Sequence, residues 1–81
     1  MTIRVTFWSY FAELAGRSET GVEVPEGATV GALLQRVYVD HPALSGLRRS
    51  TLVAVGVEYE DDTHVLSPGD RVSLFPPVQG G

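Results

Sequence analysis

The stretch TVGALLQRVYVD, residues 29–40, decides the fold of this chain. Its apolar residues fall at i, i+3, i+4 and i+7, the stripe of an amphipathic helix: Val30, Leu33, Leu34 and Val37. Thr29 is a favoured residue for capping the first turn through its hydroxyl. Pro42 disfavours helical geometry at the residue before it, so the helix is expected to end near Asp40. The sequence therefore predicts one main helix here.

Strands are predicted on both sides of this helix. Ahead of it, alternating apolar and polar residues over 3–7 and again over 19–24 indicate two strands that pair, with a short helical turn at 10–15 between them. Behind it, apolar and β-branched runs indicate a central strand covered on both faces, a short strand and a final strand: 51–57, 64–66 and 71–75. This order predicts an α+β domain in which a mixed sheet packs on one main helix.

Two turns are expected between the later strands. The acidic run 58–62 turns the chain after the central strand. Residues 67–70, Ser-Pro-Gly-Asp, place Pro and Gly at the two central positions that a type II turn prefers. No linker, repeat or low-complexity segment interrupts the chain, so we expect a single domain over residues 1–81, with 76–81 as a flexible functional tail.

The composition is typical of a small folded domain. The 81 residues are 43% hydrophobic and 20% charged, which leaves room for one small core. No apolar stretch approaches the ~20 residues of a membrane span and no signal peptide is recognised, so we expect a cytoplasmic protein without membrane contact. The net charge of −4 opposes binding to nucleic acid. Cysteine and lysine are both missing, which excludes a thiol nucleophile and lysine-mediated links between copies.

The segment after the last strand has a distinctive composition: Pro76-Pro77-Val78-Gln79-Gly80-Gly81. The two prolines cannot donate ladder hydrogen bonds, and their fixed φ keeps the chain extended as it leaves the sheet. The two glycines lack a Cβ, so they form the thinnest possible peptide. We expect this terminus to be inserted into the active site of another protein, although terminal glycines in an arbitrary protein more often only fray.

The parity of strand residues places aromatic side chains beside the root of this tail. Leu74 shares a side with Val72 and is expected to face the helix, so Phe75 points to the opposite face. Trp8 falls on the same far face, and Tyr59 lies just past a strand end. Because aromatic residues are enriched at interface centres, these three aromatics are predicted to form a docking patch. The alternative is that shorter loops fold over them.

Motifs of an enzyme are weak in this sequence. His41 and His64 stand alone without cysteine, so no metal site is predicted. No serine lies in a nucleophile elbow, and no glycine-rich phosphate loop is present. The pair Arg48-Arg49 in a connecting segment is more typical of a solubilising pair than of an anion site. We therefore predict a protein without catalytic apparatus of its own.

Three stretches resemble the MoaD family, the small subunits of molybdopterin synthase: FWSYFAELAG at 7–16, LSPGDRV at 66–72 and FPPVQGG at 75–81. A bare Gly-Gly end is shared by the wider ubiquitin-like sulfur carriers, whereas Phe-Pro-Pro-Val-x-Gly-Gly is typical of the molybdopterin branch. The match spans the whole chain and implies a β-grasp fold. One departure is Gly56, where the family commonly has Asn after an Ala-Val pair.

The resemblance also implies a function. In the family the carboxylate of the terminal glycine, here Gly81, is adenylated by an ATP-using activating enzyme resembling MoeB and converted to a thiocarboxylate. The tail then enters a large subunit resembling MoaE, where its sulfur is transferred to precursor Z to build the dithiolene of molybdopterin. By the same resemblance Trp8, Tyr59 and Phe75 correspond to positions that face these partners. ATP is used by the activating partner, and no cofactor is expected to bind this chain tightly.

Two other functions remain open. A sulfur carrier with the same chemistry can serve thiamine, cysteine or tRNA thiolation. A ubiquitin-like protein modifier, or a β-grasp interaction module, would instead have its tail joined to lysines of target proteins. The element Phe75-Pro76-Pro77 favours the molybdopterin branch.

Overall fold

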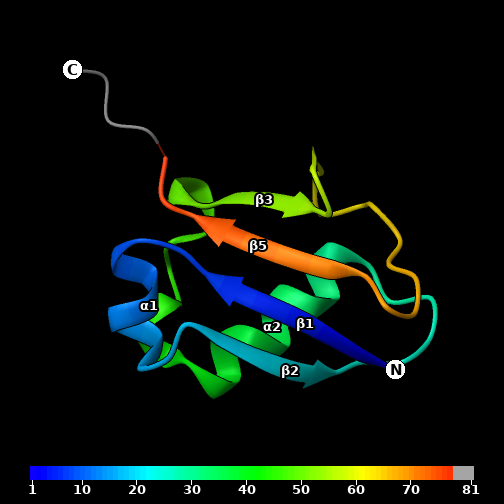
Figure 1. Ribbon diagram of the computed structural model, residues 1–81, viewed down its shortest axis with the longest axis horizontal. Coiled ribbons are helices and arrows are strands. Elements are labelled where there is room, and N and C mark those ends of the chain that lie inside the picture. The colour runs from blue at the N-terminus through cyan, green and yellow to red at the C-terminus, as the bar shows by residue number, and fades with distance from the viewer. Residues whose placement is uncertain (78–81) are drawn as a thin grey trace.

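The computed structural model describes residues 1–77, which form a sheet and two α-helices (Figure 1). The elements are β1 (Thr2–Phe7), α1 (Tyr10–Ala15), β2 (Glu19–Glu23), α2 (Val30–Asp40), the 3₁₀ turns η1 (Pro42–Leu44) and η2 (Arg48–Ser50), β3 (Leu52–Val55), β4 (Glu58–Tyr59) and β5 (Arg71–Phe75).

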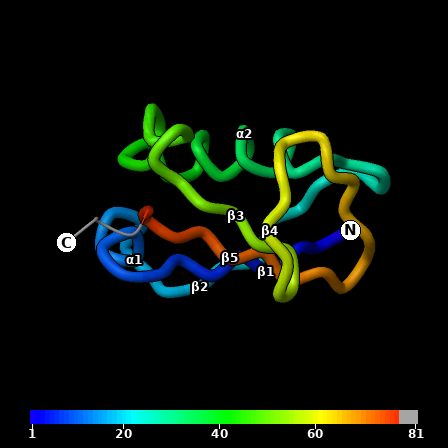
Figure 2. Tube along the Cα trace, turned by 90° about the horizontal axis from the view of Figure 1, so that it is seen from above, coloured from blue at the N-terminus to red at the C-terminus, as the bar shows by residue number. Residues whose placement is uncertain are grey.

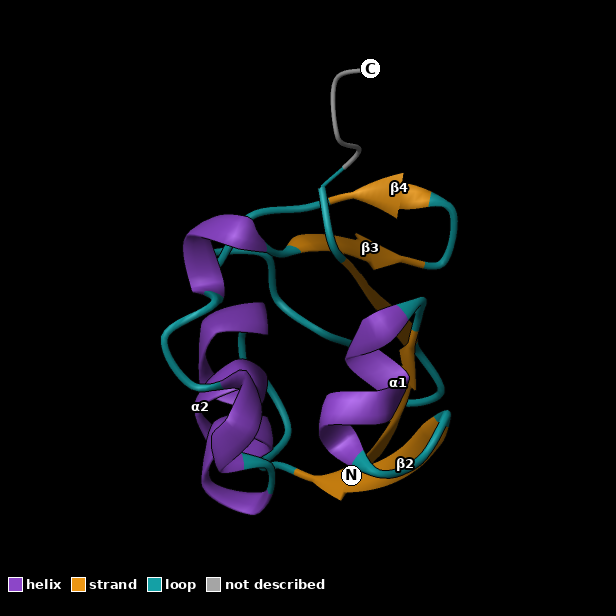
Figure 3. Ribbon diagram, turned by 90° about the vertical axis from the view of Figure 1, so that its left-hand side faces the viewer, coloured by secondary structure: helices purple, strands orange, loops and turns teal. Residues whose placement is uncertain are grey.

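The five strands form one mixed sheet in the order β2-β1-β5-β3-β4. β1 and β5 are parallel, and every other neighbouring pair is antiparallel. α2 lies across one face of the sheet, and in the described part of the chain no helix covers the opposite face (Figure 2). α1 sits beside the end of the sheet (Figure 3). The predicted α+β architecture, with a mixed sheet on one main helix, is confirmed.

The main helix forms as its sequence predicts. The Thr29 hydroxyl accepts a hydrogen bond from the Ala32 N–H at 3.2 Å, and the helix ends at Asp40, just before Pro42 begins η1. Its buried side chains are the four of the predicted stripe: Val30, Leu33, Leu34 and Val37. Burial of each stabilises the fold by about 1.5–3 kcal/mol. Within residues 1–77, no helix has the length and hydropathy needed to cross a bilayer.

The two central strands supply the other half of the core. Ile3, Val5 and Phe7 of β1 alternate inward, and so do Val72 and Leu74 of β5. All five are almost completely buried against α2 and its neighbours. The inward direction predicted for Leu74 is confirmed, which fixes the outward direction of the residue that follows it.

The prediction of a strand at 64–66 is wrong. Val65 makes only an isolated bridge, to Thr29. The carbonyls of His64 and Asp62 accept hydrogen bonds from the first two N–H groups of α2, at 2.9 and 3.0 Å. Because the first four N–H groups of a helix have no partner inside it, this loop completes the helix instead of extending the sheet.

The prediction of a turn over 58–62 is wrong for its first two residues, which form the edge strand β4. A tight hairpin joins them to β3, and Gly56 at its corner has a φ of +61°. Glycine and asparagine both tolerate positive φ, so the departure from the family at Gly56 is compatible with this turn. The register pairs Ala54 with Tyr59, so Tyr59 belongs to the sheet.

Candidate functional site

Three aromatic side chains gather on the sheet face that α2 leaves open. Trp8 stacks on Phe75, with ring centroids 5.7 Å apart and an interplanar angle of 18°. Tyr59 meets Phe75 edge-on, with centroids 6.4 Å apart and an angle of 75°. We call Trp8, Tyr59 and Phe75 the aromatic face. Residues from the end of β1, from β4 and from β5 are thus brought together as the sequence predicts, while their role in docking stays a prediction.

The strand register explains this gathering. Phe7 pairs with Leu74 between β1 and β5, and both side chains are buried. The residue that follows in each case, Trp8 directly after β1 and Phe75 on β5, therefore points to the other face. The N–H of Trp8 continues the pairing by donating to the Leu74 carbonyl at 3.0 Å. The stack is therefore held by the two central strands of the sheet.

The aromatic face is open to solvent. Trp8 is 49% exposed and Tyr59 is 69% exposed. Within the described residues, the alternative in which loops fold over these side chains is therefore wrong. A contiguous exposed apolar patch on a small protein is typical of an interaction site.

Leu52 extends the aromatic face, although the sequence did not predict this. It pairs with Phe75 across β3 and β5, and its side chain is 36% exposed. The strand 51–57 was expected to be covered on both faces, which is wrong at Leu52 because the second face of the sheet carries no helix in the described part of the chain. The alternation of side chains along a strand could have predicted this exposure, because Leu52 is the neighbour of the buried Val53.

The tail begins at the aromatic face. β5 ends at Phe75, and Pro76 and Pro77 follow it, both half-buried. Figure 1 shows β5 ending at the same end of the sheet at which β1 ends and α1 begins. The other predicted tail residues lie outside the described residues: Val78, Gln79, Gly80 and Gly81.

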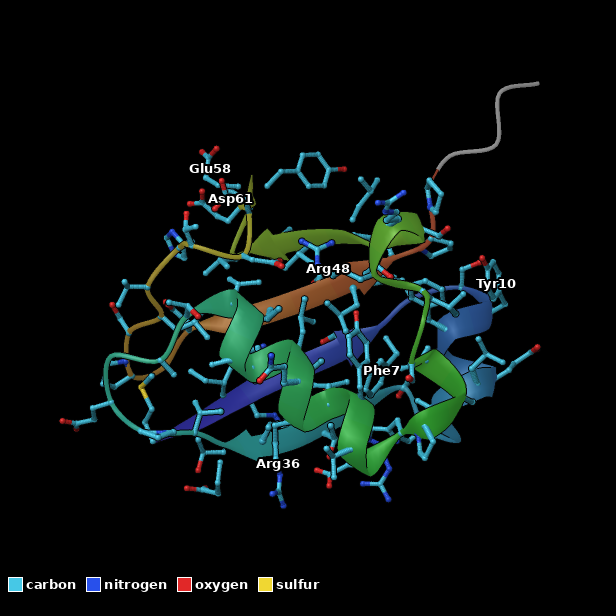
Figure 4. All side chains as sticks on the ribbon, turned by 180° about the vertical axis from the view of Figure 1, so that it is seen from behind. Phe7, Tyr10, Arg36, Arg48, Glu58 and Asp61 are labelled. Atoms are coloured by element: carbon cyan, nitrogen blue, oxygen red, sulfur yellow. The ribbon has the colours of Figure 1, made fainter. Side chains whose placement is uncertain are left out.

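Acidic residues border the Tyr59 side of the aromatic face. Glu58 and Asp61 project into solvent around the end of β4 (Figure 4). Hydrogen bonds from the hydroxyl and the backbone N–H of Thr63 hold the pKa of the Asp61 carboxyl below its ordinary value. The aromatic face thus has a negatively charged rim on this side.

A shallow hollow behind this rim does not define a ligand. Its volume is about 370 Å³, and its lining mixes one cation, two carboxylates and apolar side chains: Arg48, Thr51, Leu52, Val53, Tyr59, Glu60 and Asp61. The Arg48 guanidinium is already bound to the Asp62 carboxylate, with its Nε 2.8 Å from Oδ1, and to the Thr51 carbonyl at 3.0 Å. Its charge therefore serves the local structure.

The two histidines lie in separate places. The His41 ring packs edge-on against Phe7 with centroids 5.2 Å apart. His64 Nδ1 lies 3.1 Å from Glu60 Oε2. Among residues 1–77, no three His, Asp or Glu side chains gather closely enough to hold a metal ion.

A family model described as the ThiS family matches residues 5–81. The chain belongs to the ThiS family. Two similar relatives are both named molybdopterin synthase sulfur carrier subunit. The one from Escherichia coli is 37% identical over 81 residues, covering 98% of this chain and 99% of the relative. The one from Homo sapiens is 35% identical over 83 residues, covering 98% and 93%. The resemblance to MoaD is confirmed.

Solved structures show the fold of this ThiS-family chain. The crystal structure of SAMP1 from Haloferax volcanii is similar to it with a TM-score of 0.90 and 30% identity, and the match covers 100% of both chains. A TM-score this high over the full length of both chains means that the two share one fold. The predicted β-grasp, ubiquitin-like fold is confirmed.

Proposed function

We propose that this ThiS-family chain is the sulfur carrier subunit of a molybdopterin synthase. The observation that carries the proposal is the position of the aromatic face at the root of the segment FPPVQGG, residues 75–81. The two relatives described above, similar over nearly their whole length, bear that name. An exposed docking surface and a slender tail that leaves from it are the two parts that a sulfur carrier needs.

The chemistry of the proposal takes place at the carboxylate of Gly81. A carboxylate is a poor electrophile at neutral pH, so an ATP-using activating enzyme converts it into a mixed anhydride with AMP and releases pyrophosphate. A sulfur donor then displaces AMP and leaves a thiocarboxylate. Gly81 supplies the carbon that is modified, and Gly80 keeps the approach narrow because it has no side chain. ATP binds the activating partner, and its use fits the cytoplasmic location expected from the sequence.

The aromatic face is proposed to bind the two partners in turn. After activation, the aromatic face docks on the large subunit of the synthase. The tail then reaches the active site of that subunit, where the sulfur of the thiocarboxylate passes to precursor Z. Pro76 and Pro77 restrict the backbone at the exit from the sheet, so less conformational entropy is lost on insertion. The chain itself contributes the thiocarboxylate from which the sulfur is transferred, and the catalytic side chains belong to the partners.

The test is the mass of the intact protein after incubation with an activating enzyme of the MoeB type, ATP and a sulfur donor. We expect one oxygen of the terminal carboxylate to be exchanged for sulfur, and no exchange when ATP is omitted. A terminus that never gains sulfur under these conditions would refute the proposal.

A second candidate function is protein modification. The observation that favours it is the similarity to SAMP1, and a curated relative 35% identical is named small archaeal modifier protein 1. In this function the tail is joined to lysines of other proteins. Purification of the protein from cells distinguishes the two candidate functions. A non-covalent complex with a large synthase subunit supports the sulfur carrier, whereas covalent conjugates that survive denaturation support the protein modifier. Recovery with enzymes of thiamine, cysteine or tRNA thiolation would identify the related carrier function.

A further inference from the structure

Ser9 has a backbone conformation that serine rarely adopts. Its φ is +56° and its ψ is −141°, and it is the only non-glycine residue with positive φ among residues 1–77. A Cβ crowds the backbone in this region, so the conformation is strained for every residue except glycine. The described positions that need a positive φ elsewhere all carry glycine: Gly16, Gly27, Gly46, Gly56 and Gly69.

The Ser9 hydroxyl does not offset this strain. Ser9 is the N-cap residue of α1, where a serine side chain usually accepts a hydrogen bond from the helix, but here the side chain makes no capping bond. The contact between Ser9 and the first turn of α1 is made by the backbone instead, since the Ser9 carbonyl accepts a hydrogen bond from the Ala12 N–H at 3.1 Å. The side chain is exposed. A capping role therefore does not explain why serine occupies this position.

Ser9 forms the junction between Trp8 and the first turn of α1. Phe7 before it and Phe11 after it are both buried, so the chain must change from strand to helix within a few residues while Trp8 stays on the open face. The Trp8 N–H is bound to the Leu74 carbonyl at 3.0 Å, and the Trp8 carbonyl accepts the Phe11 N–H at 3.1 Å. Ser9 lies inside the turn that the second of these hydrogen bonds closes, and its φ shares a peptide plane with the Trp8 carbonyl.

We infer that Ser9 is a positioning residue that keeps the indole of Trp8 stacked on Phe75, ready for docking. Glycine would form the same turn with less strain, but it would also admit backbone conformations that a Cβ forbids. The folded contacts hold the junction at positive φ, and the Cβ of serine leaves it fewer conformations there than glycine would have. This pre-organisation lowers the entropy lost when a partner binds. The link to docking rests on the proposed function, whereas the effect on Trp8 does not.

The protein contains one tryptophan, so its fluorescence reports on Trp8 alone. We compare wild type, Ser9→Gly and Ser9→Ala by time-resolved fluorescence anisotropy of the isolated protein. Ser9→Ala keeps the Cβ and removes only the hydroxyl, so it is the matched control. We expect the fast component of the anisotropy decay to be larger in Ser9→Gly than in wild type. The anisotropy decay of Ser9→Ala should match that of wild type. The Tm of Ser9→Gly is expected to stay equal or rise by a few degrees, since strain is relieved.

The second measurement is the affinity of each variant for the purified large subunit. We expect Ser9→Gly to bind about three- to tenfold more weakly and Ser9→Ala to bind like wild type. The inference is overturned if Trp8 is as immobile in Ser9→Gly as in wild type, or if its loosening leaves the affinity unchanged. Failure of the wild type to bind any large subunit would count against the proposed function instead, and the anisotropy would still decide whether Ser9 positions Trp8.

Discussion

The indole of Trp8 lies stacked on the phenyl ring of Phe75 at a centroid distance of 5.7 Å, although the two residues come from opposite ends of the chain. Trp8 directly follows β1 and Phe75 ends β5, and these two strands are the parallel pair inside the sheet. The contact therefore exists only in the complete fold. It also places the proposed docking surface directly at the residue from which the tail leaves.

The first prediction concerns Phe75→Asp. A buried charge at the centre of an interface removes apolar contact and is not paired, so we expect binding to the large subunit to weaken by about 2 kcal/mol or more, roughly 30-fold. The loss of folding stability, seen as a fall in Tm, should be much smaller than the loss of binding free energy, because Phe75 is only half-buried in the free protein. Calorimetric titration and thermal unfolding measure the two effects.

Val39→Asp is the matched control for this substitution. Val39 is 71% exposed on α2, across the sheet from the aromatic face, so Val39→Asp makes the same apolar-to-acidic change at a place that should not meet the partner. An equal loss of affinity in both variants would contradict the assignment of the docking surface.

The second prediction concerns deletion of Gly81. The last residue of the described core is Leu74, seven residues before Gly81, so the free energy of unfolding should be unchanged. Sulfur transfer to precursor Z should be lost completely, because the deletion moves the activated carbon away from its place in the partner's active site. Persistent transfer by the shortened protein in a reconstituted synthase assay would refute the role of Gly81.

The third prediction concerns the cap of α2. Thr29→Ala removes the hydroxyl that accepts the Ala32 N–H, so we expect the free energy of unfolding to fall by about 1 kcal/mol. Thr29→Ser keeps an acceptor at the same place and should lose far less. Urea denaturation checks both, and equal losses would show that the methyl group of Thr29 matters more than its hydroxyl.

The fourth prediction concerns pH. Hydrogen bonds from Thr63 hold the pKa of Asp61 below its ordinary value of 3.8 in the folded protein. Their stabilisation is therefore fully present above that value and is lost as the pH falls through the lower folded-state pKa. Thr63→Ala should be less stable than wild type at neutral pH, and the difference should shrink below pH 3.8. A difference that stays constant in acid, measured by urea denaturation, would contradict this linkage; Thr63→Ser is the control.

The parts of the fold that follow from local periodicity could be predicted from the sequence. The stripe of α2 and the alternation in β1 each specify an inward face, and the outward positions of Trp8 and Phe75 follow from counting residues. The turn at 67–70 was predictable as well, because its third residue, Gly69, needs the positive φ of +86° that it has.

The parts that depend on tertiary contacts could not be predicted. The loop around His64 looks like a strand by its β-branched residues, but its carbonyls complete the first turn of α2, which no local pattern indicates. β4 is only two residues long, too short for an alternating pattern, and the corner at Gly56 returns the chain to β3. The strain at Ser9 has no sequence signal, since serine before a helix ordinarily predicts a cap.

The position of β5 between β1 and β3 has a consequence for how the protein is made. Until residue 75 has been synthesised, the first strand and the third share no sheet, so a nascent or truncated chain has two separate strand groups with exposed apolar faces. Exposed apolar faces and unpaired strand edges of this kind favour aggregation. β5 therefore joins the two strand groups into one sheet, and it is also the strand from which the tail leaves.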